Sequence, residues 1–167
     1  DLFSLFVFME VTGICCFVMI AMFRSRADLE GSFKYLVMSE MASIFLLSGM
    51  AFLFMRTGSL RFEDLKGLAA DGATLSDRLV QFSMVLMLSG FAVKTGAVPF
   101  HSWLPGAHQS ADTAVSVLLS GIVIKIAGVY GLLVVSRIFD GFPSIRAALA
   151  VIGVVSILYG AILAARQ

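Results

Sequence analysis

The sequence predicts an all-α integral membrane protein with five transmembrane helices, one of which is discontinuous. Hydrophobic residues make up 59% of the chain and charged residues only 14%, whereas charged residues make up about a quarter of a soluble domain. Apolar runs of roughly 20 residues, the helical length that crosses a hydrocarbon core of about 30 Å, occur five times. The alternation of polar and apolar residues that is typical of membrane β-strands does not recur along the chain.

The predicted helices follow one another in a single transmembrane domain, residues 1–167. They cover residues 2–23, 34–55, 79–98, 113–136 and 145–165. Between them we expect a charged turn at 24–30, a long polar stretch with a short surface helix at 56–78, and a tight turn at 137–144. Lys and Arg occur in both of the first two connections, so their distribution does not predict orientation. The chain begins and ends beside apolar runs, so we expect it to be a segment of a longer protein.

The segment after the third helix predicts a break at membrane depth. It reads VPFHSWLP over residues 98–105 and contains Pro99 and Pro105 as expected helix breakers. A proline lacks an N–H and clashes with the carbonyl four residues earlier, so Pro99 should free the carbonyl of Thr95. Non-helical backbone inside a membrane is stable only within protein or beside a water-filled cavity. We therefore expect this helix to be the discontinuous one.

Three ionisable residues lie inside the apolar runs: Glu10, Lys94 and Lys125. A charge at the bilayer centre costs about 3 kcal/mol on insertion scales, so such residues are functional candidates by default. Extension of the side chain to the membrane surface is the alternative, but it is difficult for the short Glu10 and from mid-helix for Lys125. Burial and neighbouring charges can move a lysine pKa by several units. We therefore predict that these residues form a proton relay.

Other residues near these charges carry more limited predictions. Gly121 and Gly128 flank Lys125 and leave room either for water or for a close partner helix. His101, in the break, has a side chain whose ordinary pKa near 6.5 suits a proton relay. Asp112 is the predicted N-cap of the fourth helix. Glu40 fits an interfacial position and a buried position equally well.

Several classes of function are not supported by the sequence. A net charge of +1 provides no basic surface for nucleic acid. The histidines and the adjacent Cys15 and Cys16 lack the partners that a metal site or a disulfide needs. Fingerprints for nucleotide binding, redox cysteine pairs or a Ser-His-Asp site do not occur. We expect no metal, no cofactor and no catalytic site on this chain, so that any enzyme activity belongs to a larger oxidoreductase complex.

Residues 90–94 (GFAVK), 98–105 (VPFHSWLP) and 121–125 (GIVIK) closely resemble one family. It comprises the antiporter-like, proton-translocating membrane subunits of respiratory complex I, of Mrp-type Na⁺/H⁺ antiporters and of membrane-bound energy-converting hydrogenases. Residues 8–10 (FME) and 33–36 (FKYL) add to the resemblance. The family usually has an acid where this chain has Gly106, and a proline within the stretch that reads ADTA at 111–114.

The resemblance implies a chain that forms about one half of a pair of inverted five-helix repeats. It also implies that Glu10 pairs with Lys94 and that Lys125 is the central relay residue. The expected function is proton translocation across the cell membrane or an equivalent energy-transducing membrane. The expected partners are other membrane subunits, the lipid bilayer and protons, with Na⁺ as an alternative. A Na⁺/H⁺ antiporter subunit, a structural membrane subunit without conduction and a quinone-binding subunit stay open.

Overall fold

The computed structural model describes residues 1–66, 77–140 and 142–166. These residues contain five helices that are long and apolar enough to cross a membrane. The candidate spans are Leu2–Ile20, Arg26–Thr57, Arg78–Ser110, Thr113–Ile138 and Ser144–Ala165, with mean hydropathies between 1.4 and 2.4. The predicted all-α integral membrane fold with five transmembrane helices is therefore confirmed.

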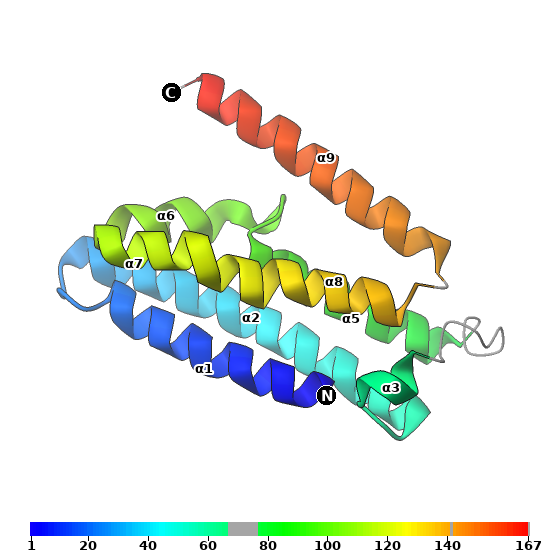
Figure 1. The fold of residues 1–167 in the computed structure, drawn as a ribbon. Coiled ribbons are helices and arrows are strands. Elements are labelled where there is room, and N and C mark those ends of the chain that lie inside the picture. The colour runs from blue at the N-terminus through cyan, green and yellow to red at the C-terminus, as the bar shows by residue number, and fades with distance from the viewer. Residues whose placement is uncertain (67–76, 141, 167) are drawn as a thin grey trace.

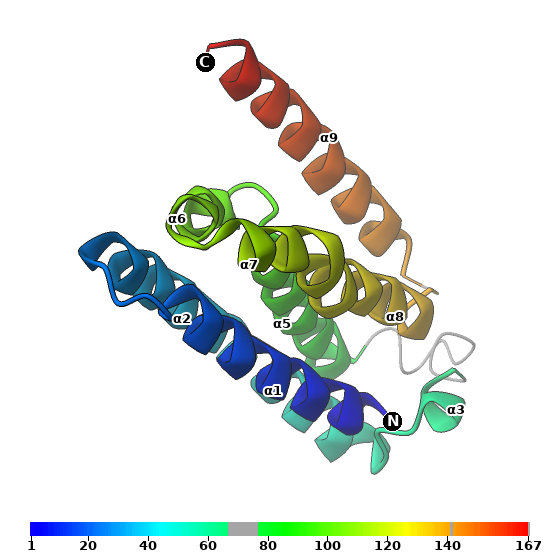
Figure 2. The ribbon, with the colours of Figure 1, turned by 60° about the vertical axis from the view of Figure 1, so that its left-hand side comes forward.

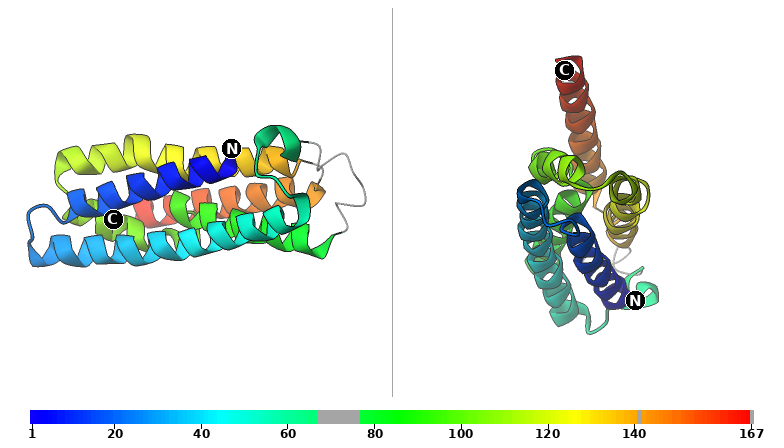
Figure 3. Two further views of the ribbon diagram at one scale, coloured as in Figure 1. Left: turned by 90° about the horizontal axis from the view of Figure 1, so that it is seen from below. Right: turned by 90° about the vertical axis from the view of Figure 1, so that its left-hand side faces the viewer.

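Four of the spans form an elongated bundle (Figures 1 and 3). Helix α2 (Arg26–Thr57) packs against α1 (Leu2–Ile20), α5 (Arg78–Thr95) and α6 (Trp103–Ser110). The fourth span joins α7 (Thr113–Leu118), a π-helix (Leu119–Tyr130) and α8 (Gly131–Ile138), and its π-helical part packs against α5. Helix α9 (Pro143–Ala165) diverges from the bundle (Figure 2). None of the residues in its most apolar stretch is buried.

The first connection is shorter than predicted because α2 begins early. Ser25 and Asp28 form a capping box, in which each backbone N–H donates to the other residue's side chain. Helix α2 therefore begins at Arg26 and not near residue 34, and most of the charged segment 24–30 forms its first turn. Helix α1 correspondingly ends at Ile20.

The polar stretch 56–78 contains the expected short helix, α3 (Phe62–Leu65), beside the end of α2 (Figure 1). Residues 67–76 of this stretch lie outside the described residues.

The third span is discontinuous, as predicted, and its break begins at Gly96. Helix α5 ends at Thr95, and Gly96 adopts a φ of 65°, the left-handed conformation that glycine tolerates. The N–H of Gly96 donates to the carbonyl of Val93, and the N–H of Ala97 donates to that of Ala92. These two bonds form a Schellman motif, so α5 stops before Pro99 is reached.

The prediction that Pro105 breaks a helix is wrong. Pro99 lies within the break and is followed by a single 3-10 turn, Phe100–Ser102, but Pro105 lies in the first turn of α6. The N–H groups of a first turn have no partner within the helix, so a proline there removes no hydrogen bond. Helix α6 therefore continues the span as far as Ser110.

Helix α7 begins at Thr113, and Asp112 caps it. The Asp112 carboxylate accepts a hydrogen bond from the N–H of Ala114 at 3.2 Å. The preceding residue, Ala111, is extended and separates α7 from α6. The predicted N-cap and the predicted start of the fourth helix are both confirmed.

Two clusters of buried apolar side chains form the core. The first includes Met9, Leu46, Met87 and Phe91, and the second includes Cys16, Tyr35, Trp103 and Leu119. The two clusters occupy successive stretches of α1, α2 and the discontinuous span. The polar residues described next lie between them along the sequence, so apolar packing holds these residues on both sides.

Candidate functional site

Lys94 is buried, with 8% of the residue exposed, in the last turn of α5. Its Nζ donates to Glu10 Oε1 on α1 at 2.9 Å and to Ser43 Oγ on α2 at 3.3 Å. The Ser43 hydroxyl donates to the same Glu10 oxygen at 2.5 Å. We call these residues the Glu10–Ser43–Lys94 cluster. The expectation that Glu10 and Lys94 lie close together is confirmed, whereas their role in proton transfer stays a prediction.

The break in α5 determines what surrounds Lys94. Lys94 stands at the carboxyl end of a helix, where the helix dipole stabilises a positive charge. At the break the N–H of Ala97 donates to Ala92 and not to Val93. The carbonyl of Val93 accepts instead from the N–H of Gly96 and from the indole N–H of Trp103, the latter at 3.1 Å. The ring of Trp103 packs edge-on against Tyr35 of α2, with centroids 5.3 Å apart. The discontinuous span is thereby fastened to α2 beside the cluster.

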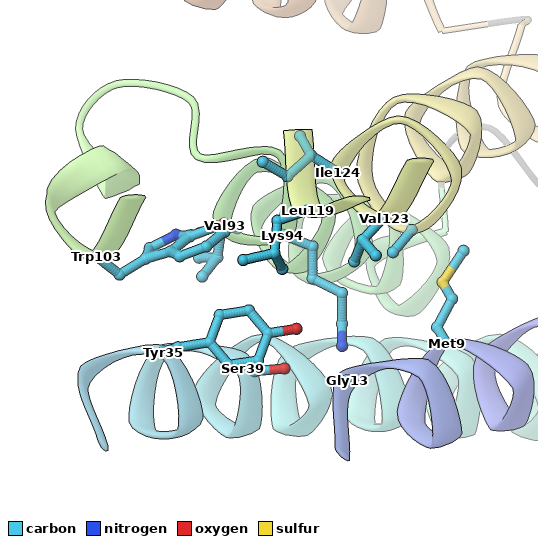
Figure 4. Close-up of a pocket in the computed structure, with 11 residues that line it drawn as sticks. Met9, Gly13, Tyr35, Ser39, Val93, Lys94, Trp103, Leu119, Val123 and Ile124 are labelled. Atoms are coloured by element: carbon cyan, nitrogen blue, oxygen red, sulfur yellow. The ribbon is translucent and has the colours of Figure 1, made fainter. Parts of the chain in front are cut away.

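A small cavity lies next to Lys94 (Figure 4). Its volume is about 20 Å³, and roughly 10–15 Å³ is enough to hold one water molecule. Most of its wall is apolar, but the hydroxyl-bearing side chains of Tyr35 and Ser39 also face it. Figure 4 shows both of their oxygens directed toward the end of the Lys94 side chain. The cavity therefore places two hydroxyl groups near the ammonium group.

Lys125 has a different environment. It lies in the middle of the π-helix and its side chain is exposed. Lys125 does not line the cavity beside Lys94. Its π-helical conformation is one that often occurs at functional sites. A Cβ on Gly128 would come within 2.5 Å of Thr95 Cγ2 on α5, whereas a Cβ on Gly121 would meet nothing within 4 Å. Gly128 thus allows a partner helix to approach, which is one of the two expected uses of the glycines.

His101 and Glu40 lie away from the cluster. The ring of His101 packs against Tyr159 of α9, with centroids 4.8 Å apart, and its Nδ1 is buried without a hydrogen-bond partner among the described residues. The N–H of Val98 donates to Ser156 of α9 at 3.1 Å, so α9 contacts the break at this level. Glu40 is exposed on α2, which excludes the buried alternative within this chain. The proton-relay role of His101 stays a prediction.

Comparison with known proteins assigns the chain to a family. All of residues 1–167 match the family described as NADH:quinone oxidoreductase/Mrp antiporter, TM. The chain belongs to this family. The NADH-quinone oxidoreductase subunit N of Francisella tularensis subsp. holarctica is 34% identical over 174 residues, which cover 100% of this chain and 35% of that protein. Subunit N of Rubrobacter xylanophilus is 36% identical over 172 residues, with the same coverage of 100% and 35%.

Two solved structures share the fold of this family member. The membrane-bound sulfane sulfur reductase, an archaeal respiratory membrane complex, matches with a TM-score of 0.76 and 30% identity over 90% of this chain and 30% of that chain. The Mrp complex from Dietzia sp. DQ12-45-1b matches with a TM-score of 0.73 and 31% identity over 84% of this chain and 26% of that chain. The predicted family is confirmed, and the chain spans 35% of the length of the curated relatives that it matches.

Sequence reasoning missed Ser43, and it included Tyr35 only within residues 33–36 of the family resemblance. Tyr35, Ser39 and Ser43 follow one another at intervals of four residues, which places them on one face of α2. This face meets Glu10 at Ser43 and the cavity at Tyr35 and Ser39. The hydroxyl spacing was visible in the sequence. Its meaning depended on which face of α2 meets α1 and α5.

Proposed function

We propose that this chain is a portion of an antiporter-like membrane subunit that moves protons across an energy-transducing membrane. The ion pair between the buried Lys94 and the partly buried Glu10, at the break of α5, is the observation that supports this function most directly. An ion pair that only stabilised the fold could be replaced by apolar residues with little effect or with a gain in stability. Ionisable residues inside membranes are rare, and they mark ion pathways and proton relays.

In the proposed mechanism, the cluster works as a switch on the protonation of Lys94. The Glu10 carboxylate stabilises the ammonium form of Lys94, because an opposite charge at hydrogen-bond distance favours the charged state. When the charge of Glu10 is neutralised or displaced by a neighbouring subunit, burial favours the neutral amine and Lys94 releases a proton. Lys125, on the adjacent span, is the next relay residue. The driving energy comes from the complex to which the subunit belongs.

The relatives suggest the setting for this activity. They are a quinone oxidoreductase subunit, an archaeal respiratory membrane complex and an Mrp complex, so the proposed partners are other membrane subunits of such a complex. The proposed location is the cell membrane or an equivalent energy-transducing membrane. We further propose that the five spans form about one of two inverted repeats, with the rest of the bundle supplied by the remaining length seen in the relatives.

Glu10→Gln in the full-length subunit tests this function in the assembled complex, reconstituted in proteoliposomes. We expect proton pumping per assembled complex to be lost, because the amide keeps the shape of the side chain but not its charge. Glu40→Gln is the matched control, since it neutralises an exposed carboxylate in the same membrane region, and it should pump normally. Normal pumping by Glu10→Gln would instead support a structural subunit. A requirement for Na⁺ in the wild-type protein would identify the transported cation as part of a Na⁺/H⁺ exchange.

A further inference from the structure

We propose that Tyr35 and Ser39 hold one water molecule beside Lys94 and that this water takes the proton that Lys94 releases. This inference rests on the proposed function and adds to it the first acceptor of the proton. It starts from the donors of Lys94. A protonated lysine carries three N–H donors, and the described residues supply two acceptors, Glu10 and Ser43. One donor is left for the cavity.

The cavity has the size and polarity to hold this water. A buried water typically needs two to four polar partners as well as sufficient volume. Lys94, Tyr35 and Ser39 provide these partners, and the remaining polar group in the wall, the Trp103 indole, is already bonded to Val93. A water in this place accepts from the ammonium and donates to a hydroxyl. Both kinds of hydrogen bond are necessary for a proton to pass through it.

The cavity lies between Tyr35 and Ser39 on α2 and the span that carries Lys125. Leu119, Val123 and Ile124 of the π-helix also line it. An N–H bond of the ammonium breaks as the proton moves from Lys94 Nζ to the water. The water then gives up a proton toward Lys125, the next relay residue of the proposed function, and returns to its neutral form.

Gly13 provides a way to remove the water without changing a polar group. It lines the cavity, and a Cβ at this position would lie 3.3 Å from Ser39 Oγ and 3.8 Å from the Tyr35 hydroxyl. A methyl group there occupies a space that holds only one water. Alanine also has a higher helix propensity than glycine, so the change does not weaken α1 itself. Gly153→Ala is the matched control, because its Cβ would meet nothing within 4 Å among the described residues.

The test compares variants of the full-length subunit in the assembled complex, with proton pumping measured per assembled complex. Tyr35→Phe/Ser39→Ala should lower pumping about 100-fold, the lower end of what loss of a positioned proton-transfer group produces. Each single variant should lose less, because the water keeps one hydroxyl partner. Gly13→Ala should lose pumping while Gly153→Ala does not. Ser39→Thr, which retains the hydroxyl, should restore most of the activity lost in Ser39→Ala.

A second readout separates proton transfer from simple packing. The slowed variants should show a larger solvent deuterium isotope effect on pumping than the wild type, because proton transfer then limits the rate. A packing role would lower thermal stability and leave the isotope effect unchanged, which would overturn the inference. Wild-type pumping by Gly13→Ala or by the double variant would overturn it as well. Wild-type pumping by Lys94→Leu would instead refute the proposed function, so the two failures are distinguishable.

Discussion

The two lysines of this chain stand in opposite environments, although both lie inside apolar helices. Lys94 is buried and bonded to Glu10 and Ser43. Lys125 is exposed on the π-helix and makes no ion pair with the described residues. The first lysine has its partners on α1 and α2, which are part of this chain. For Lys125, the described residues provide no such charged partner.

The difference shows which part of the proposed relay this segment contains in full. An uncompensated charge facing lipid at the bilayer centre costs about 3 kcal/mol or more, so a stable protein must cover Lys125 with protein or water. The relatives are nearly three times as long as this chain, since it covers 35% of them. We therefore regard the Lys94 site as complete within this segment and the Lys125 site as one wall of a larger site.

Replacing Lys125 tests this comparison with the largest expected effect. Lys125→Ala in the full-length subunit should abolish proton translocation in proteoliposomes and leave assembly intact, because no partner within the segment depends on this charge. Assembly is checked by the yield of intact complex, and pumping is normalised to it. If the assembled variant pumped like the wild type, Lys125 would not be a relay residue. If assembly failed, Lys125 would have a structural partner elsewhere in the complex.

Replacing Lys94 or Glu10 should affect folding as well as transport. Glu10→Leu leaves the charge of Lys94 buried without its partner, which typically destabilises a protein by about 3–5 kcal/mol. Lys94→Leu should cost less, because 22% of the Glu10 side chain is exposed. The double variant leaves no unpaired charge, so it should lose less stability than the two singles added together. It should still not pump, because the switch is absent. Unfolding of the purified full-length subunit in detergent measures the stabilities.

The critical quantity is the coupling energy between Glu10 and Lys94, which the two single variants and the double variant measure together. Strictly additive effects on stability and pumping would contradict a functional pair in spite of the 2.9 Å contact. A large coupling in stability with no effect on pumping would assign the pair to structure alone. Lys125→Leu provides the contrast, because it should show no coupling to Glu10.

The membrane-spanning helices could be predicted from the sequence, and the ionisable residues inside them were easy to recognise. The membrane limits both the length and the composition of the segments that cross it. Apolar length determines the spans, and charges such as Glu10 and Lys94 stand out against them. Local chemistry moved the boundaries: the Ser25–Asp28 capping box started α2 early, and Gly96 ended α5 before Pro99. These signals were present in the sequence but are shorter in range than hydropathy.

The environment of each charge was less predictable. The π-helix changes which residues around Lys125 share a face, and an expectation based on α-helical spacing placed Gly121 and Gly128 alike beside the lysine. In the structure one glycine is exposed and the other packs on α5. Ser43 was missed for a related reason, since its importance follows from the packing of three helices.

The two glycines therefore allow a smaller test of the same comparison. Gly128→Ala should destabilise the subunit by about 1–3 kcal/mol, the usual range for overpacking, because its Cβ would lie 2.5–2.9 Å from atoms of Thr95. Gly121→Ala should not disturb the packing within this segment, since its Cβ would meet nothing within 4 Å. Thermal unfolding of the full-length subunit measures both. Equal losses would indicate that the Lys125 helix does not approach α5 through Gly128.

The smallest expected effect concerns Asp112, which caps α7, the first helix of the span that carries Lys125. Asp112→Ala should lower stability by about 1 kcal/mol, the typical effect of losing an N-cap. Hydrogen exchange of the amides in the first turn of α7 should then rise about fivefold, because local opening there becomes easier by that amount. Exchange in the last turn of α5 should not change. Asp112→Asn keeps the cap and removes the charge, so it should exchange like the wild type. Faster exchange in Asp112→Asn to the same extent as in Asp112→Ala would show that the charge, and not the hydrogen bond to Ala114, holds this helix end.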